Sequence, residues 1–230
     1  MQDTTARRLN RIGAASGIAN VVLTFVGFGL IVGAVGATDL ASTREEIARH
    51  FADPAPTLLW VGGFLEWIGI LLFVPFTATL VAAFQRHDVA DWLASTLFGA
   101  GILFVATGIL SLSAGATAYL QAGGALEPGV AVALAHVRSF AFTLGWGIAA
   151  LFLGAVAALV LTRGVLPRWL GWAAGILALM LLGGLAAPKA EFAQTPPMLM
   201  ALWILVSSIV LLRRPASRRV GHAVGAATEA

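Results

Sequence analysis

The chain has 230 residues, of which 59% are hydrophobic and 11% are charged, and its mean hydropathy is +0.91. A soluble domain carries about 25% charged residues, so this composition excludes an ordinary soluble domain and predicts a membrane protein. The net charge of +3 comes from basic residues scattered over loops and termini, which is typical of topology signals and not of a nucleic-acid-binding surface. The absence of cysteine excludes disulfides, thiolate metal sites and a cysteine nucleophile.

A polar segment, 1–11, precedes the first apolar run at 12–35. This run exceeds the about 7–15 apolar residues of a signal peptide, so an uncleaved first span is expected. Small and polar residues recur along it at helical spacing: Gly13, Gly17, Asn20, Thr24 and Gly27. Such a face packs closely against other membrane helices. Asn20 is its only amide, and an interhelical hydrogen bond is favoured there over a ligand contact.

A short amphipathic helix is predicted after the first span, over about 43–52. Ser42 and Glu45 form a capping-box pattern ahead of it. Ile47 and Phe51 fall four residues apart and therefore share one side of the helix. We expect this helix to lie along the outer membrane interface.

The second apolar run, 57–84, carries an acidic residue, Glu66, among apolar neighbours. A carboxylate at mid-helix costs about 2.5–3.5 kcal/mol on insertion scales, so Glu66 must face protein or water. Gly62 and Gly69 share its face at helical spacing and leave room for a neighbouring helix or a small ligand.

Four further apolar runs complete a bundle of six membrane-spanning helices within residues 12–212. Their predicted bounds are 92–121, 139–162, 169–186 and 196–212, and the tail at 213–230 is expected to be disordered. Apolar character begins before the fourth span, at Val130, and lasts to Thr162. This is too long for one untilted span, so either a short outer helix precedes it or one long helix projects beyond the lipid. The predicted fold is an all-α membrane protein, a six-helix transmembrane bundle with a short amphipathic outer interfacial helix.

Basic residues are unevenly divided between the two sides of this bundle. Ten of the 14 lie in the N-terminal segment, in the turns that contain Arg86 and Arg163, and in the C-terminal tail. The other four are Arg44, Arg49, Arg138 and Lys189. The positive-inside rule then predicts both termini in the cytoplasm. The excess of Arg over Lys and the abundance of Ala and Gly indicate a GC-rich bacterial genome, so the expected location is the inner membrane of a bacterial cell.

Aromatic residues are expected both at the interfaces and inside the bundle. Trp60 and Tyr119 fall near the outer interface, as aromatic belts do. The inner belt comprises Trp92, Trp169 and Trp172. Trp67 and Trp146 lie deeper and could line an apolar pocket with Phe142, although core packing without a ligand is the favoured interpretation.

The main candidate site combines Glu66 with Arg138. Counted from the cytoplasmic ends of their spans at 1.5 Å per residue, the two lie about 27 and 37 Å up the bundle. The Arg138 side chain is long enough to reach down towards Glu66, and an ion pair would keep the acid charged, whereas apolar burial alone would leave it neutral. A functional pair and a purely structural one are equally supported, because intramembrane acids are functional by default but no second acid follows along the path.

The full set of candidate ligand-binding residues is Glu66, Arg138, Trp67, Phe142, Trp146, Tyr119 and Asn20. No catalytic residue, metal site or cofactor is predicted, because the four histidines show no zinc or haem spacing and no Gly-rich phosphate loop follows a strand.

The segment GFLEWIGILLFVPFTATLVAAFQRHD joins an acid, a proline and a basic turn. It resembles the second span of a family of uncharacterised six-span membrane proteins of bacteria, actinobacteria in particular, which carry only a domain-of-unknown-function label. The resemblance continues through VLPRWLGW. It implies a six-span architecture with Glu66 and Pro75 as family features, and it implies no assigned chemistry. The long fourth segment with Arg138 is not matched.

Three functions from different classes follow. The first is binding or movement of a small molecule or a proton through an outer pocket around Glu66 and Arg138. The second is a non-catalytic structural or regulatory subunit that docks a partner through small-residue helix faces. The third and least favoured is a membrane enzyme acting on lipid or quinone. The expected partners are the lipid bilayer and a lipid or small-molecule ligand, with no nucleic acid; the sequence does not predict a protein partner or an oligomeric state.

Overall fold

A computed structural model of the chain describes residues 2–36, 42–51, 55–85, 91–122, 128–188 and 195–213. Over these residues the protein forms seven helices and no strand. The helices are α1 (Gln2–Val35), α2 (Arg44–His50), α3 (Thr57–Gln85), α4 (Asp91–Ala122), α5 (Pro128–Arg163), α6 (Arg168–Ala186) and α7 (Thr195–Arg213). All except α2 are long and apolar enough to cross a membrane. The predicted all-α fold with six such helices is confirmed.

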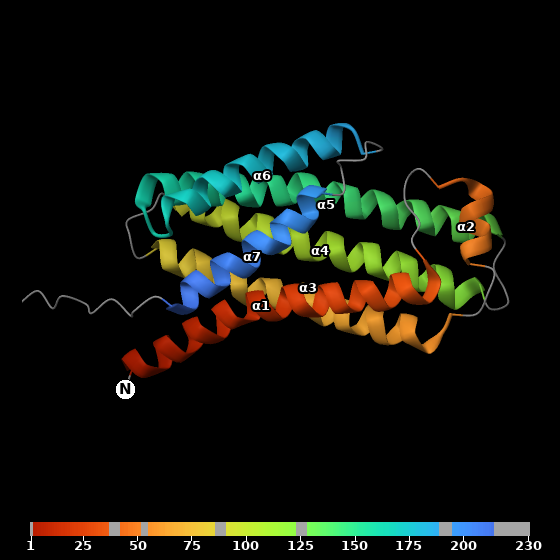
Figure 1. Cartoon of the computed structure of the whole chain (residues 1–230), viewed down its shortest axis with the longest axis horizontal. Helices are drawn as coiled ribbons and strands as arrows, with labels where there is room; N and C mark the ends of the chain where they lie inside the picture. The colour runs from red at the N-terminus through yellow and green to blue at the C-terminus, as the bar shows by residue number, and fades with distance from the viewer. Residues whose placement is uncertain are drawn as a thin grey trace, which may run out of the picture.

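The six long helices run up and down along one axis (Figure 1). α1 packs mainly on α3, α4 packs on α3 and α5, and α6 packs on α5, while α7 crosses between α1 and α6. α1 begins and α7 ends at the same end of the bundle, which is called here the terminal end; α2 lies at the opposite end, called here the α2 end (Figure 1). Short connections between successive spans require this antiparallel order.

The bounds of two helices refine the predicted spans. α1 begins at Gln2, so the helix continues through most of the polar segment predicted at 1–11. α5 is one continuous helix of 36 residues, which decides between the two arrangements that were open for the fourth span. The connecting residues 86–90, 123–127 and 189–194, and the tail after Arg213 that was predicted to be disordered, lie outside the described residues.

Glycines bring α1 and α3 into backbone contact, as the small-residue faces of the two spans predicted. A Cβ atom added to Gly27 would lie 2.5 Å from the carbonyl oxygen of Gly62 and 2.6 Å from the backbone nitrogen of Glu66. A Cβ atom on Gly69 would lie 2.6 Å from the Thr24 hydroxyl oxygen. Side chains at these positions would therefore force the two helices apart. In a membrane, where apolar burial does not drive helices together, such close packing is a main source of association.

The middle of the bundle is filled by phenylalanine. The ring of Phe73 on α3 is fully buried, and its centroid lies 5.2 Å from that of Phe104 on α4 and 5.1 Å from that of Phe152 on α5. These tilted ring pairs join three helices at one level and hold the centre of the bundle together.

The short helix α2 is capped one residue later than the sequence pattern indicated. Thr43, not Ser42, is the N-cap: its hydroxyl accepts a hydrogen bond from the Glu46 backbone nitrogen at 3.3 Å, and Glu46 accepts one from the Thr43 backbone nitrogen at 2.7 Å. The prediction was wrong by one position because the segment STREE contains the capping-box pattern in two overlapping registers. The apolar side of α2 is as predicted, since Ile47 and Phe51 are buried.

The buried side of α2 packs onto the ends of α3, α4 and α5. It forms a separate small apolar cluster whose other members are Leu59, Ala118, Tyr119, Ala131 and Ala135. Glu45 and Arg49 on the other side of α2 are exposed. The helix is therefore amphipathic and covers part of the α2 end of the bundle.

Candidate functional site

Arg138 lies in the α2-end half of α5, pressed against α4. The Ser111 hydroxyl on α4 donates a hydrogen bond to the Arg138 carbonyl oxygen at 3.0 Å. One turn further along α4, a Cβ atom on Gly115 would lie 2.9 Å from Cδ and 3.2 Å from Nε of Arg138. Glycine at position 115 therefore leaves the space that the arginine side chain occupies, and α4 provides the surface along which this side chain is laid.

Glu66 enters the same half of the bundle from α3. Its backbone packs against Gly27 of α1, and its side chain is partly buried. The charge of Arg138 acts on Glu66, but no salt bridge joins the two and neither side chain has a hydrogen-bond partner among the described residues. The direct ion pair that the reach of Arg138 suggested is therefore not formed. Glu66 and Arg138 therefore interact electrostatically but are not bonded to each other.

A histidine and a tyrosine close the cluster from the α2 end. The hydroxyl of Tyr119 on α4 is hydrogen-bonded to Nε2 of His50, the last residue of α2. The ring of Phe51 lies 4.6 Å from that of Tyr119, centroid to centroid. Tyr119 is only 4% exposed, so it does not stand in the outer aromatic belt where the sequence placed it. It instead joins α2 to the bundle.

His50 is the titratable group of this cluster that lies outside the spans. Its partial burial lowers the pKa of the imidazole below the usual value, the positive charge of Arg138 lowers the pKa further, and a backbone hydrogen bond to Val35 acts in the opposite direction. A neutral His50 therefore suits the folded state. The same arginine acts electrostatically on Glu66, on Tyr119 and on His50, which makes Arg138 the electrostatic centre of the cluster.

The structure brings three of the seven predicted site residues together and places the other four elsewhere. Glu66, Arg138 and Tyr119 share the cluster. Trp67 is 43% exposed on the outside of α3, so the core packing that was favoured for it is not observed. Phe142 is also exposed, and its ring makes an edge contact with the buried Trp146, with centroids 5.8 Å apart.

Asn20 makes the interhelical bond that the sequence favoured. Its side-chain amide donates to the Gly69 carbonyl oxygen on α3 at 2.8 Å, and the residue is buried. This bond lies one turn along α3 from Glu66, so Asn20 fixes the helix that carries the acid.

His50 is the member of the site that sequence reasoning missed. It is 69 positions away from Tyr119, and only the docking of α2 on α4 and α5 brings the two rings together. The available signal was its position at the end of the predicted amphipathic helix, next to Phe51 on the buried side. That signal places His50 at the bundle but does not name its partner.

Comparison of the chain with protein-family models, with curated proteins and with solved structures finds no match. The resemblance to the bacterial six-span family therefore stays a prediction. Among the described residues, no group of three or more His, Asp or Glu side chains is placed to hold a metal ion.

Proposed function

We propose that this membrane protein binds, or moves through the α2-end half of the bundle, a small polar molecule or a proton, with Glu66 and Arg138 as the interacting groups. The observation that carries the proposal is that both side chains lie in membrane-spanning helices and neither is bonded to a described residue. Charged groups in such helices are costly unless they are paired or face a pathway. A ligand, water or a proton supplies the partner that the bundle itself does not.

The chemistry of the cluster limits what it would recognise. An arginine offers a guanidinium that binds carboxylate or phosphate oxygens through two parallel hydrogen bonds, while a carboxylate binds an ammonium group or a proton. Small zwitterions carry both groups and are complementary to the pair. The Tyr119–His50 pair and the apolar side of α2 lie on the α2-end side of Glu66 and Arg138. Helix α2 is therefore placed to control access to these two side chains.

The alternative function, docking of a partner through small-residue faces, has less support. The glycine face of α1 is occupied by α3, and the face of α4 that contains Ser111 and Gly115 is occupied by α5. These faces are used inside the bundle, so they are not available to another protein.

A reconstitution experiment tests the proposed function. The protein is placed in vesicles that contain a pH-sensitive dye, a potassium gradient with valinomycin drives proton movement, and glycine is added outside as a zwitterion probe. With the unchanged chain we expect proton uptake above that of protein-free vesicles, or thermal stabilisation of the protein by glycine. With Glu66→Gln we expect both responses to be lost. Glu45→Gln is the matched control, because it removes the same charge from the exposed side of α2. If the unchanged chain gives neither response, or if Glu66→Gln behaves as Glu45→Gln does, the proposal is wrong.

A further inference from the structure

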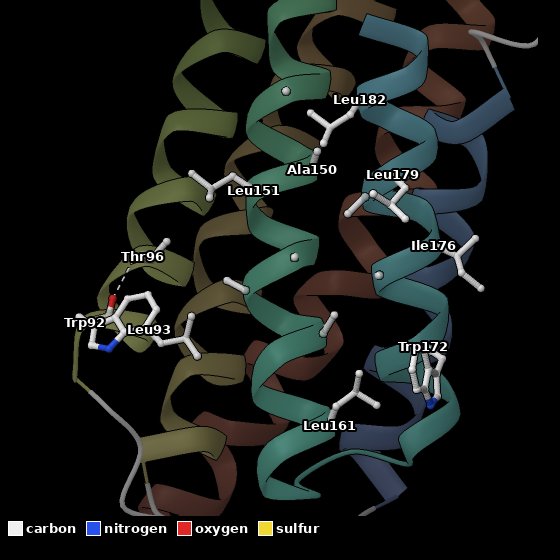
Figure 2. Close-up of a pocket in the computed structure, with 16 residues that line it drawn as sticks. Trp92, Leu93, Thr96, Ala150, Leu151, Leu161, Trp172, Ile176, Leu179 and Leu182 are labelled. Carbon is white, nitrogen blue, oxygen red and sulfur yellow. Dashed lines mark hydrogen bonds between the residues drawn. The ribbon is translucent and has the colours of Figure 1, made fainter. Parts of the chain in front are cut away.

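A groove of about 730 Å³ runs over α5 between α4 and α6 (Figure 2). Its floor is made of small residues: Gly147, Ala150, Gly154, Ala157 and Gly175. Its rim includes exposed leucine and isoleucine side chains, among them Leu151, Ile176 and Leu179, so the groove opens on the outer surface of the bundle. The hydroxyl of Thr96, its one polar side chain other than tryptophan, is bonded to the Trp92 carbonyl oxygen on its own helix at 2.8 Å. The groove therefore presents an apolar surface to lipid.

The length of the groove matches one leaflet of a bilayer. On α6 its lining extends from Trp172 at one end to Leu182 at the other (Figure 2). Ten residues of helix rise about 15 Å. The hydrocarbon core of a bilayer is about 30 Å thick, so one acyl chain in one leaflet extends over about the same distance.

The end of the groove near Trp172 carries positive charge. α6 begins at Arg168, four residues before Trp172 and therefore on the same side of that helix, while Arg163 ends α5 two residues after the groove residue Leu161 and points to the other side of α5. Both arginines are exposed, and neither forms an ion pair with another described residue. Trp92 stands on the opposite side of the groove from Trp172 (Figure 2), and both rings are exposed. Tryptophan is enriched at the headgroup level, and basic residues near the membrane surface attract anionic lipids.

We propose that this groove binds an anionic phospholipid, with an acyl chain along the glycine and alanine floor and the phosphate beside Arg168. The site shares no residue with the cluster around Glu66 and Arg138, and it does not depend on the function proposed for that cluster. A lipid suits the groove better than a second copy of the chain. Two copies related by a two-fold axis along the membrane normal would bring the same arginines together at one depth, where like charges repel.

The groove floor allows a filling variant with a matched control. A Cβ atom added to Gly154 meets nothing within 4 Å, so a side chain can leave the backbone there without a clash, and Gly154→Leu is expected to occupy the space of the acyl chain. Gly29 on α1 is equally open and lies outside the groove, so Gly29→Leu adds the same side chain elsewhere. The proteins are taken from vesicles of equal parts phosphatidylglycerol and phosphatidylcholine into detergent, and retained lipid is counted by native mass spectrometry.

We expect one retained phosphatidylglycerol on the unchanged chain and on Gly29→Leu, and at least about tenfold less on Gly154→Leu. A basic residue near an anionic group contributes a factor of about five, so Arg168→Gln should lower the preference for phosphatidylglycerol over phosphatidylcholine about fivefold. Arg11→Gln removes the same charge from the exposed surface of α1 and should leave that preference unchanged.

Three results would overturn the proposal. Equal retention by Gly154→Leu would show that the lipid binds elsewhere. Equal retention of the two phospholipids by the unchanged chain would show that Arg168 does not select an anion. A dimer that Gly154→Leu dissociates would identify a second copy as the occupant.

Discussion

At the scale of single residues, two glycines of α1 differ in what a side chain at their position would meet. Gly27 faces backbone atoms of α3, which cannot rotate away, whereas Gly29 on the same helix faces open space. The two differ in environment but not in residue type or helix. They therefore separate the effect of packing from the intrinsic effect of replacing glycine in a helix.

We expect Gly27→Ala to lower the free energy of unfolding in detergent by about 1–3 kcal/mol, the usual range for overpacking a tight contact. Gly29→Ala should leave stability unchanged or raise it by up to about 1 kcal/mol, because alanine favours helix over glycine. Chemical unfolding followed by circular dichroism measures both. Equal effects of the two substitutions would mean that α1 and α3 are less closely packed than the structure describes.

A second residue-scale prediction concerns the charges of Glu66 and Arg138. Because no salt bridge joins them, we expect Arg138→Leu to destabilise the protein more than Glu66→Leu/Arg138→Leu, but with a coupling energy of only about 1 kcal/mol. Breaking a buried, directly bonded pair costs about 3–5 kcal/mol. A double-mutant cycle on unfolding free energies measures the coupling. A coupling of zero would remove Arg138 from the site, and one above about 3 kcal/mol would require a direct ion pair.

At the scale of elements, α2 is a helix of 7 residues whose place depends on tertiary contacts. So short a helix is marginal in water, and its buried side and the His50–Tyr119 bond hold it on the bundle. Protonating His50 would add a positive charge near Arg138 in a partly buried position. The docking of α2 should therefore depend on pH.

We expect α2 to loosen in acid. Burial and Arg138 depress the pKa of His50 in the folded state, so the folded protein binds this proton less readily than the unfolded chain does. Stability associated with neutral His50 is then complete above the ordinary pKa of 6.5 and is lost as the pH falls below it. Hydrogen-exchange protection in α2, corrected for intrinsic exchange, should be lower at about pH 5 than at about pH 7.5.

His50→Gln should remove this pH dependence while keeping a hydrogen-bonding group near Tyr119. The protection of α6 should change neither with pH nor with this substitution. Protection of α2 that rises in acid, or a pH dependence that persists in His50→Gln, would assign the effect to another group.

The sequence predicted the elements better than it predicted their contacts. Long apolar runs are helical in a membrane because each backbone polar group must be bonded within its own segment, so α3, α4, α6 and α7 could be placed to within a few residues. The continuity of α5 could not be predicted, because hydropathy does not distinguish a break from a projection beyond the lipid.

Within the candidate site, the rotation of each helix about its own axis decides which of the predicted contacts form. Glu66 and Arg138 could be predicted as a site because ionisable residues are rare in spans, and helical spacing predicted the glycines beside Glu66. Whether the two side chains touch depends on the rotation of α3 and α5, which is set by packing against α1 and α4. Trp67 was misplaced for the same reason, since it is 43% exposed and was predicted to lie inside the bundle. The His50–Tyr119 bond depends on where α2 docks, and no local pattern contains that information.

At the scale of the whole molecule, charge and aromatic residues mark the two ends differently. The terminal end holds the arginines at the start of α1, at the end of α5, at the start of α6 and at the end of α7. It also holds the exposed rings of Trp92, Trp169 and Trp172, where an inner aromatic belt was predicted. The α2 end holds the polar cluster beneath α2. An even number of spans places the start of α1 and the end of α7 on one side of a membrane, and the positive-inside rule predicts that this side is the cytoplasm.

The absence of cysteine makes this orientation directly testable, because any introduced cysteine is the only thiol in the chain. Arg8→Cys lies at the terminal end and Glu45→Cys lies on the exposed side of α2. Removing one of the ten arginines that the sequence predicts for the cytoplasmic side leaves the charge asymmetry in place. In intact cells, a membrane-impermeant maleimide should label Glu45→Cys and not Arg8→Cys, and after permeabilisation it should label both. The reverse pattern would show that the protein has the opposite orientation in the membrane, with the polar cluster and α2 on the cytoplasmic side. Labelling of both positions in intact cells would contradict a structure in which the two ends of the bundle lie on opposite sides of the membrane.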